Sequence, residues 1–104
     1  MEKDGDLNTI ITADYPTSES QTRKKRILLV DDEPDHCMVY QIVLEDAGYQ
    51  CVSFTDSVKA LQEFRPDYYD LVILDIKMPK LDGFALCEKI REVERDVQII
   101  FITA

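Results

Sequence analysis

The sequence predicts an α/β fold, a doubly wound parallel sheet with helices on both faces. Two observations predict it. Four short apolar runs recur along residues 26–104, and segments with apolar residues at helical spacing separate them. Strands that are buried on both faces read as continuous apolar runs, and strands that alternate with helices form parallel sheets with right-handed crossovers.

The bulk composition fits one soluble domain. The chain has 104 residues, of which 45% are hydrophobic and 32% charged. No apolar run approaches the roughly 20 residues of a membrane span, and the N-terminus lacks a signal pattern, so we expect a cytoplasmic protein with no membrane partner. A net charge of −9 repels phosphates, so we expect no direct nucleic acid binding. The basic run "RKKR" at 23–26 is interpreted as a solvated approach to a strand.

Residues 1–25 are predicted to be a flexible tail, and residues 26–104 the folded domain. The tail is polar, contains Gly5 and Pro16, and shows no sustained period of a strand or helix. Its short apolar patch "LNTII" has no predicted contact.

The cysteines and the single histidine do not predict a metal or disulfide framework. Cys37, Cys51 and Cys87 are odd in number and widely spaced, without a C-x-x-C pair. Each is predicted to be a small buried hydrophobe. His36 has no second His or Cys at ligand spacing and is predicted to face solvent in the first turn of a helix.

The first strand and helix are predicted from residues 26–48. "RILLV" at 26–30 is a buried strand, and Pro34 suits the first helical position because its missing N–H would be unpaired there. Gly48 is a natural stop. The predicted apolar stripe of this helix consists of Val39, Val43 and Ala47, flanked by Tyr40 and Leu44.

The remaining elements follow the same alternation. Strands are predicted at 49–54, 71–75 and 97–104, with a short helix from about Ser57 and a longer one that fades near Glu94. The helices are marked by Val58, Leu61 and Phe64 in the first and by Phe84, Cys87 and Ile90 in the second.

Carboxylates follow two of the predicted strands. Asp31 and Asp32 come after the first strand, and Asp75 ends the third. Functional groups of open parallel sheets gather beyond the carboxyl ends of strands, where strand order reverses. If the two strands are neighbours, the three charges converge and need a cation, and Mg²⁺ prefers such oxygen ligands. A carboxylate beside Mg²⁺ can attack phosphorus and form an aspartyl phosphate.

Each motif also has a simpler interpretation. "DDEPD" in isolation fits helix capping, and "MPKLDG" fits a turn. Their occurrence together, each at the end of a strand in an alternating chain, favours a functional site.

Three motifs, "ILLVDDEPD", "LVILDIKMPKLDG" and "IIFITA", resemble in this order the receiver domain of two-component response regulators. The resemblance runs from Arg26 to Ala104. It implies a flavodoxin-like receiver fold, Mg²⁺ as cofactor, and Asp75 as phosphoacceptor. The donor would be the phosphohistidine of a sensor histidine kinase or a phosphotransfer protein.

The resemblance also implies roles at the metal. Asp32 and Asp75 would ligate Mg²⁺ through their side chains and Lys77 through its backbone carbonyl, while Asp31 would act through a metal-bound water. The side chain of Lys77 would tune hydrolysis of the phosphoryl group.

Other positions match the family's loop and switch. Thr103 would be the switch hydroxyl that hydrogen-bonds the phosphoryl oxygens, and Ala104 the small residue beside it. Pro79 and Gly83 would shape the loop after the phosphoacceptor.

The chain departs from the family pattern, which has five strands, because only four are predicted here. We therefore expect a receiver that is incomplete at the C-terminus and lacks the last helix-strand-helix, with no residue assigned as the strand-five lysine or the aromatic switch partner. The fourth strand would be an exposed edge that favours a homodimer, domain swapping or aggregation. Loss of an electrostatic stabiliser would make phosphotransfer slow or absent.

Three functional interpretations remain. The first is a phosphoacceptor module that is not an enzyme, beyond Mg²⁺-dependent self-phosphorylation and autodephosphorylation. The alternative is a phosphorylation-incompetent pseudo-receiver that acts as an interaction or dimerisation module. A phosphatase is disfavoured because such enzymes usually carry Asp-x-Asp, whereas Ile76 and Lys77 follow Asp75. Nucleotide or flavin binding is disfavoured because no Gly-rich loop follows the first strand.

Overall fold

A computed structural model describes residues 23–103. The predicted tail falls almost entirely on residues 1–22, outside the described residues, and so does Ala104. The boundary between tail and domain therefore stays a prediction.

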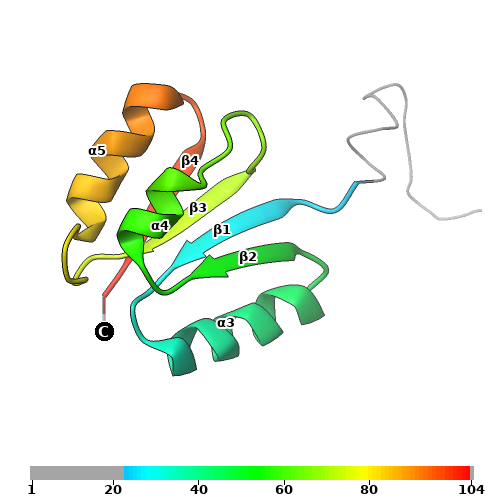
Figure 1. The fold of residues 1–104 in the computed structure, drawn as a ribbon. Helices are drawn as coiled ribbons and strands as arrows, with labels where there is room; N and C mark the ends of the chain where they lie inside the picture. The colour runs from blue at the N-terminus through cyan, green and yellow to red at the C-terminus, as the bar shows by residue number, and fades with distance from the viewer. Residues whose placement is uncertain (1–22, 104) are drawn as a thin grey trace, which may run out of the picture.

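Four parallel strands alternate with three helices in the described chain (Figure 1). The strands are β1 (Arg26–Val30), β2 (Gln50–Phe54), β3 (Leu71–Asp75) and β4 (Gln98–Ile102), in the sheet order β2-β1-β3-β4. The helices are α3 (Pro34–Asp46), α4 (Ser57–Gln62) and α5 (Gly83–Val93). Strand order thus reverses between β1 and β3, and the predicted doubly wound α/β class is confirmed.

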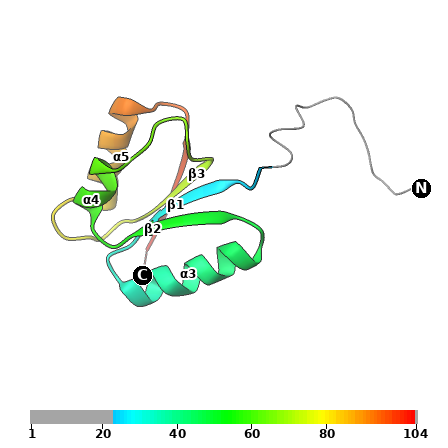
Figure 2. The same cartoon turned by 45° about the vertical axis from the view of Figure 1, so that its right-hand side comes forward.

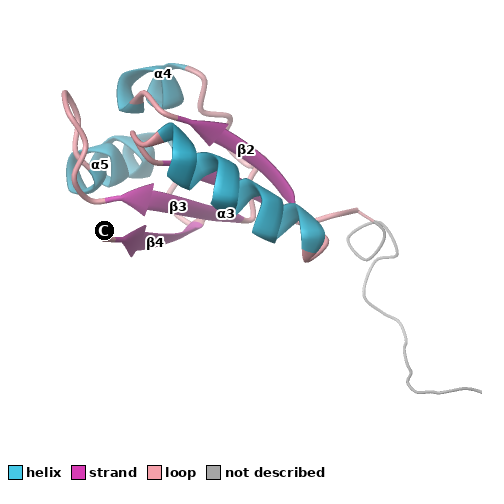
Figure 3. Ribbon diagram, turned by 90° about the horizontal axis from the view of Figure 1, so that it is seen from below, coloured by secondary structure: helices cyan, strands magenta, loops and turns pink. Residues whose placement is uncertain are grey.

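The helices cover the two faces of the sheet unequally. Helix α3 lies alone on one face, and α4 and α5 lie together on the other (Figures 1 and 2). Seen from the α3 side, this helix crosses in front of the sheet (Figure 3). Helix α3 contacts β2 and β1, so the β3–β4 half of its face has no helix among the described residues.

Local chemistry explains where the helices begin. The side chain of Asp56 accepts hydrogen bonds from the first amides of α4, and Asp82 caps α5 in the same way. Helix α3 instead begins with Pro34 and has no side-chain cap. Helix α4 is shorter than predicted, because it ends at Gln62 and leaves Phe64 beyond its last turn.

The main core lies between the sheet and the α4/α5 pair. Alternate residues of β1 and β3 point into this core, and α4 and α5 supply apolar side chains from the opposite side. Its buried members are Leu28, Val30, Ala60, Tyr69, Val72, Leu74, Met78, Leu86, Ile90 and Val97.

The α3 face has a much smaller core. Leu29, Cys37 and Cys51 are its buried members, with Leu44 and Ile73 packed against them. The predicted stripe of α3 was wrong: its members Val39, Val43 and Ala47 are exposed. Cys37 and Leu44 turn toward the sheet instead, two turns apart, and this places the other apolar residues of the helix in solvent.

The cysteine prediction is largely confirmed. Cys37 and Cys51 are buried, Cys87 is partly buried, and all three are free thiols. Burial raises the pKa of the Cys51 thiol to about 11. In the part of the chain that the structure describes, no helix is long and apolar enough to cross a membrane.

Candidate metal centre

The acidic residues lie at one edge of the sheet. Strands β1 and β3 are paired neighbours, and their pair Val30–Leu74 is followed by Asp31 just beyond β1 and by Asp75 at the end of β3. The strands point the same way, so their carboxyl ends meet at this edge (Figure 1). The condition for convergence, that the first and third strands are adjacent, is therefore met.

The three carboxylates form one cluster. Asp31, Asp32 and Asp75 each offer an oxygen, and these atoms lie within 4.8 Å of one another. Asp31 is 1% and Asp75 5% exposed, whereas Asp32 is half-buried. Buried carboxylates repel each other in a low-dielectric setting unless a positive charge offsets them.

Asp31 is held by the beginning of α3. One of its oxygens accepts the backbone N–H of Glu33 at 2.9 Å, and the other lies 3.2 Å from Nδ1 of His36. The prediction for His36 holds only in part, because the residue lies in the first turn of α3 with its side chain 41% exposed, but its ring also contacts Asp31. As an early helical residue it projects back toward the strand end that precedes the helix.

Cys37 contacts the backbone of Asp31. Its thiol donates to the carbonyl oxygen of Asp31 at 3.2 Å. Burial, followed by the nearby Asp31 charge, raises the pKa of this thiol, which therefore stays protonated and keeps its hydrogen bond at neutral pH.

Asp75 is fixed by the loop that follows it. The backbone N–H of Lys77 donates to Oδ1 of Asp75 at 3.3 Å, and the N–H of Gly83 donates to the carbonyl of Ile76 at 2.8 Å. A Cβ at position 83 would collide with the carbonyl oxygen of Asp75 and lie 2.9 Å from Cα of Ile76. Glycine at this position therefore lets α5 begin directly against the backbone of Asp75.

The donor set fits a hard divalent cation. The three carboxylates offer only oxygen atoms, and these atoms lie close enough together to bind one ion. Mg²⁺ prefers oxygen ligands and keeps several bound waters. The backbone carbonyl of Lys77 belongs to the same loop, two residues after Asp75. The residues present thus fit Mg²⁺.

Thr103 lies at the same edge of the sheet. Ile102 pairs with Asp75, and the N–H of Ile76 donates to the carbonyl of Ile102 at 3.0 Å. Thr103 is the next residue and is exposed. Its position is compatible with a hydroxyl that turns toward Asp75, and its role stays a prediction.

Comparison with known families agrees with this geometry. The family described as the response regulator receiver domain matches residues 27–104. The chain belongs to this family. The predicted family membership is thereby confirmed.

Curated relatives of this receiver domain are longer proteins. A probable transcriptional regulator, ycf27, of Pyropia yezoensis is 40% identical over 84 residues, which cover 81% of this chain and 34% of the relative. The alkaline phosphatase synthesis transcriptional regulatory protein PhoP of Bacillus subtilis is 36% identical over 77% of this chain and 33% of its own length. The receiver domain thus spans about a third of these relatives.

Solved structures share the fold. The non-phosphorylated receiver domain of HemR from Leptospira biflexa has a TM-score of 0.74 and 36% identity over 78% of this chain and 65% of its own. TrrA of Thermotoga maritima, in complex with Mg²⁺ and BeF, has a TM-score of 0.70 and 38% identity, and the match covers 77% of this chain and 70% of TrrA. TrrA in complex with the histidine kinase ThkA has a TM-score of 0.71 and 41% identity, and the match covers 77% of this chain and 69% of TrrA.

Sequence reasoning missed two contacts of this receiver domain. One is the approach of His36 to Asp31. The other is an ion pair between Lys80 and Asp56, 24 residues apart in sequence, which joins two loops beside the site. A usable signal was present for His36, because the early turns of a helix that follows Asp31 pass close to it. No local signal connects Lys80 to Asp56.

Proposed function

We propose that this receiver domain accepts a phosphoryl group on Asp75 from the phosphohistidine of a sensor histidine kinase or a phosphotransfer protein, in a Mg²⁺-dependent reaction. The observation that supports it is the convergence of three carboxylates at the carboxyl edge of two adjacent strands. A rigid strand holds the nucleophile in place, and phosphoryl transfer requires that the reacting groups are held in the correct geometry.

We infer a separate role for each oxygen of Asp75. Oδ1 accepts the N–H of Lys77, which leaves Oδ2 to attack phosphorus. The new O–P bond forms as the P–N bond of the donor breaks, and the electron pair stays on the imidazole. Bound Mg²⁺ would neutralise charge on the carboxylates and the phosphoryl oxygens.

The remaining roles are part of the same proposal. Asp32 and Asp75 would ligate the metal with their side chains, Lys77 with its carbonyl, and Asp31 through a water. Thr103 would hydrogen-bond the phosphoryl oxygens. The domain would catalyse nothing beyond its own phosphorylation and dephosphorylation.

The proposed partner docks beside the site. The α3 helix starts at the carboxylate cluster and exposes Met38, Val39 and Ile42, at 58%, 53% and 61%. Exposed apolar side chains in a row are a feature of protein interaction sites. TrrA, with 41% identity, forms a complex with a histidine kinase, which supports the same class of partner. We expect this partner and the domain to meet in the cytoplasm, without direct nucleic acid contact.

Intact-protein mass spectrometry after incubation with Mg²⁺ and acetyl phosphate tests the proposal. We expect the parent to gain one phosphoryl group, and Asp75→Asn to gain none. Omission of Mg²⁺ should abolish the gain. A folded parent with no added mass would contradict the proposal and favour the pseudo-receiver.

The second candidate function is that of a dimerisation module, and the surface formed by β4 and α3 favours it. Among the described residues β4 pairs only with β3, so its outer edge is open. An apolar groove of about 130 Å³ lies between α3 and β4. It is lined by Leu29, Tyr40, Val43, Leu44, Ile73, Ile100 and Ile102. A second copy that pairs along β4 would cover both features.

Light scattering over a range of concentrations tests the dimer. We expect the parent to show a concentration-dependent mass and Ile100→Lys, at a residue that is 40% exposed, to stay monomeric. A parent mass that stays at one chain throughout the range would contradict the dimer.

A further inference from the structure

The loop that follows Asp75 is held at its base and at its middle. We call residues 76–82 the phosphoacceptor loop. At the base, the N–H of Gly83 donates to the carbonyl of Ile76 at 2.8 Å. In the middle, Met78 is 8% exposed and belongs to the main core. Lys77, the proposed carbonyl ligand, lies between these two anchors.

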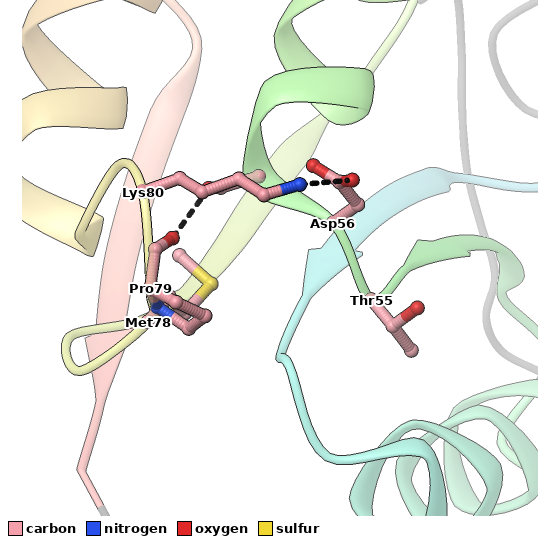
Figure 4. A pocket seen from close by; sticks show the side chains of 6 residues that line it. Thr55, Asp56, Met78, Pro79 and Lys80 are labelled. Atoms are coloured by element: carbon pink, nitrogen blue, oxygen red, sulfur yellow. Dashed lines mark hydrogen bonds and ion pairs between the residues drawn. The ribbon is translucent and has the colours of Figure 1, made fainter.

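The tip of the loop has a third attachment, to a different element. Nζ of Lys80 lies 3.1 Å from Oδ2 of Asp56 (Figure 4). The hydroxyl of Ser57 donates to the carbonyl of Pro79 at 3.4 Å. Asp56 and Ser57 stand where β2 passes into α4. A notch of about 80 Å³ separates the two segments, lined by Thr55, Asp56, Ser57, Met78, Pro79 and Lys80.

Asp56 has hydrogen bonds to its own helix that orient its carboxylate. Its Oδ1 accepts the N–H groups of Val58 and Lys59, at 2.9 and 3.2 Å, and so caps α4. The other oxygen is thereby aimed at Lys80. The backbone hydrogen bond from Lys59, followed by the bond from Lys80, lowers the pKa of Asp56, so it is ionised at neutral pH.

The backbone of Lys80 needs such a partner. Its φ is +69°, in the left-handed region that residues other than glycine rarely adopt. A strained conformation of this kind persists only where surrounding contacts hold it. At this position the ion pair with Asp56 is one such contact.

We propose that the Asp56–Lys80 pair is a clasp that holds the tip of the phosphoacceptor loop against the start of α4, and that both residues thereby position the Lys77 carbonyl at the metal site. The clasp follows from the contacts alone, whereas the positioning role rests on the proposed function. Lys80 and Asp56 are 63% and 42% exposed at their side chains. The clasp is therefore weak and sensitive to salt, as exposed ion pairs are.

Solvent exchange of the Lys77 and Leu81 amides, followed by NMR in the unphosphorylated protein, tests the clasp. The Leu81 amide donates to the carbonyl of Pro79 within the loop, and the Lys77 amide donates to Oδ1 of Asp75, just before the loop. We expect Asp56→Asn and Lys80→Ala each to speed their exchange by about two- to fivefold, the range that an exposed ion pair supports. Asn keeps the cap of α4, so the first variant removes little besides the charge. In the parent, salt at about 1 M should have the same effect.

Matched controls separate the clasp from general loosening. Lys59→Ala removes another exposed ion pair, to Glu63, that stays within the α4 segment and does not reach the loop. It should leave loop exchange unchanged, and the β1 amides should stay unchanged in all variants. The clasp is refuted if either clasp variant leaves loop exchange unchanged, if Lys59→Ala matches them, or if β1 amides accelerate equally.

Titration with Mn²⁺, followed by electron paramagnetic resonance, tests the positioning role. We expect both clasp variants to bind Mn²⁺ about two- to fivefold more weakly than the parent, because the lost pair no longer holds the loop. Faster loop exchange with unchanged Mn²⁺ affinity would refute the positioning role. A parent that binds no Mn²⁺ would refute the proposed metal site, while solvent exchange would still decide the clasp.

Discussion

The two faces of the sheet differ in how completely they are packed. On the α4/α5 face, alternate residues of β1 and β3 join two helices in one contiguous core. On the α3 face, one helix buries little more than Cys37 against the sheet, and Val43 remains 59% exposed. The same strands supply both faces, so the difference comes from what covers them.

This difference separates stability from access. Val72 and Leu74 anchor β3 in the packed face, while Ile73 points to the α3 side. By strand alternation Asp75 shares the side of Ile73, and Asp31 beside it is contacted by His36 of α3. The proposed nucleophile is thus held by the well-packed face and opens toward the sparsely packed one.

The largest expected effect lies in the packed face. Leu86→Ala, at a residue with 0% exposure, should lower the free energy of unfolding by about 2–5 kcal/mol, because it removes buried surface and leaves a cavity. Urea denaturation measures it. Ile42→Ala on the exposed side of α3 is the matched control and should change stability by less than about 0.5 kcal/mol. Equal losses would erase the contrast between the faces.

Gly83→Ala should have the next largest effect. The added Cβ would collide with the backbone of Asp75 at the start of α5, and such overpacking costs about 1–3 kcal/mol. The collision should outweigh the helical preference for alanine. Thermal unfolding and Mn²⁺ titration of the variant would measure both stability and the site. A variant as stable as the parent would show that α5 can shift away from β3 freely.

Leu44→Ala examines the sparse face directly. Leu44 is only partly buried against Leu29 and its neighbours, so we expect a loss of about 1 kcal/mol, well below that of Leu86→Ala. The same urea denaturation applies. A loss as large as that of Leu86→Ala would mean that a further partner, such as a second copy, covers this face in solution.

The smallest effect is a pH-dependent one that belongs to neither face. Burial raises the pKa of Asp70, but hydrogen bonds from Arg23 and from the N–H of Arg26 outweigh it, so the pKa is lowered overall. A lowered pKa stabilises the folded state at neutral pH, and this is lost as the pH falls below about 4, through the folded pKa.

Asp70→Asn should therefore be less stable than the parent at pH 7, by under about 1 kcal/mol because the pair is partly exposed. Urea denaturation at pH 7 and at pH 3 measures the difference, which should shrink at the lower pH. A difference that persists at pH 3 would show that the charge of Asp70 is not its source.

The sequence by itself determined the order of elements and the residues of the carboxylate cluster. Short continuous apolar runs that alternate with helical patterns favour buried strands. A charge at the end of such a run falls where the strand leaves the sheet, so the cluster of Asp31, Asp32 and Asp75 was predictable. The family motifs then named the chemistry that those residues carry.

Only the tertiary structure decided which side of α3 faces inward and what holds the phosphoacceptor loop. The helix is apolar around much of its circumference, so periodicity placed Val39 and Val43 inward, whereas contact with the sheet selected Cys37 and Leu44. The Asp56–Lys80 pair likewise forms between distant loops whose approach depends on the packing of α4 and α5. Local sequence carries no record of such contacts, because they arise only when separate elements are brought together.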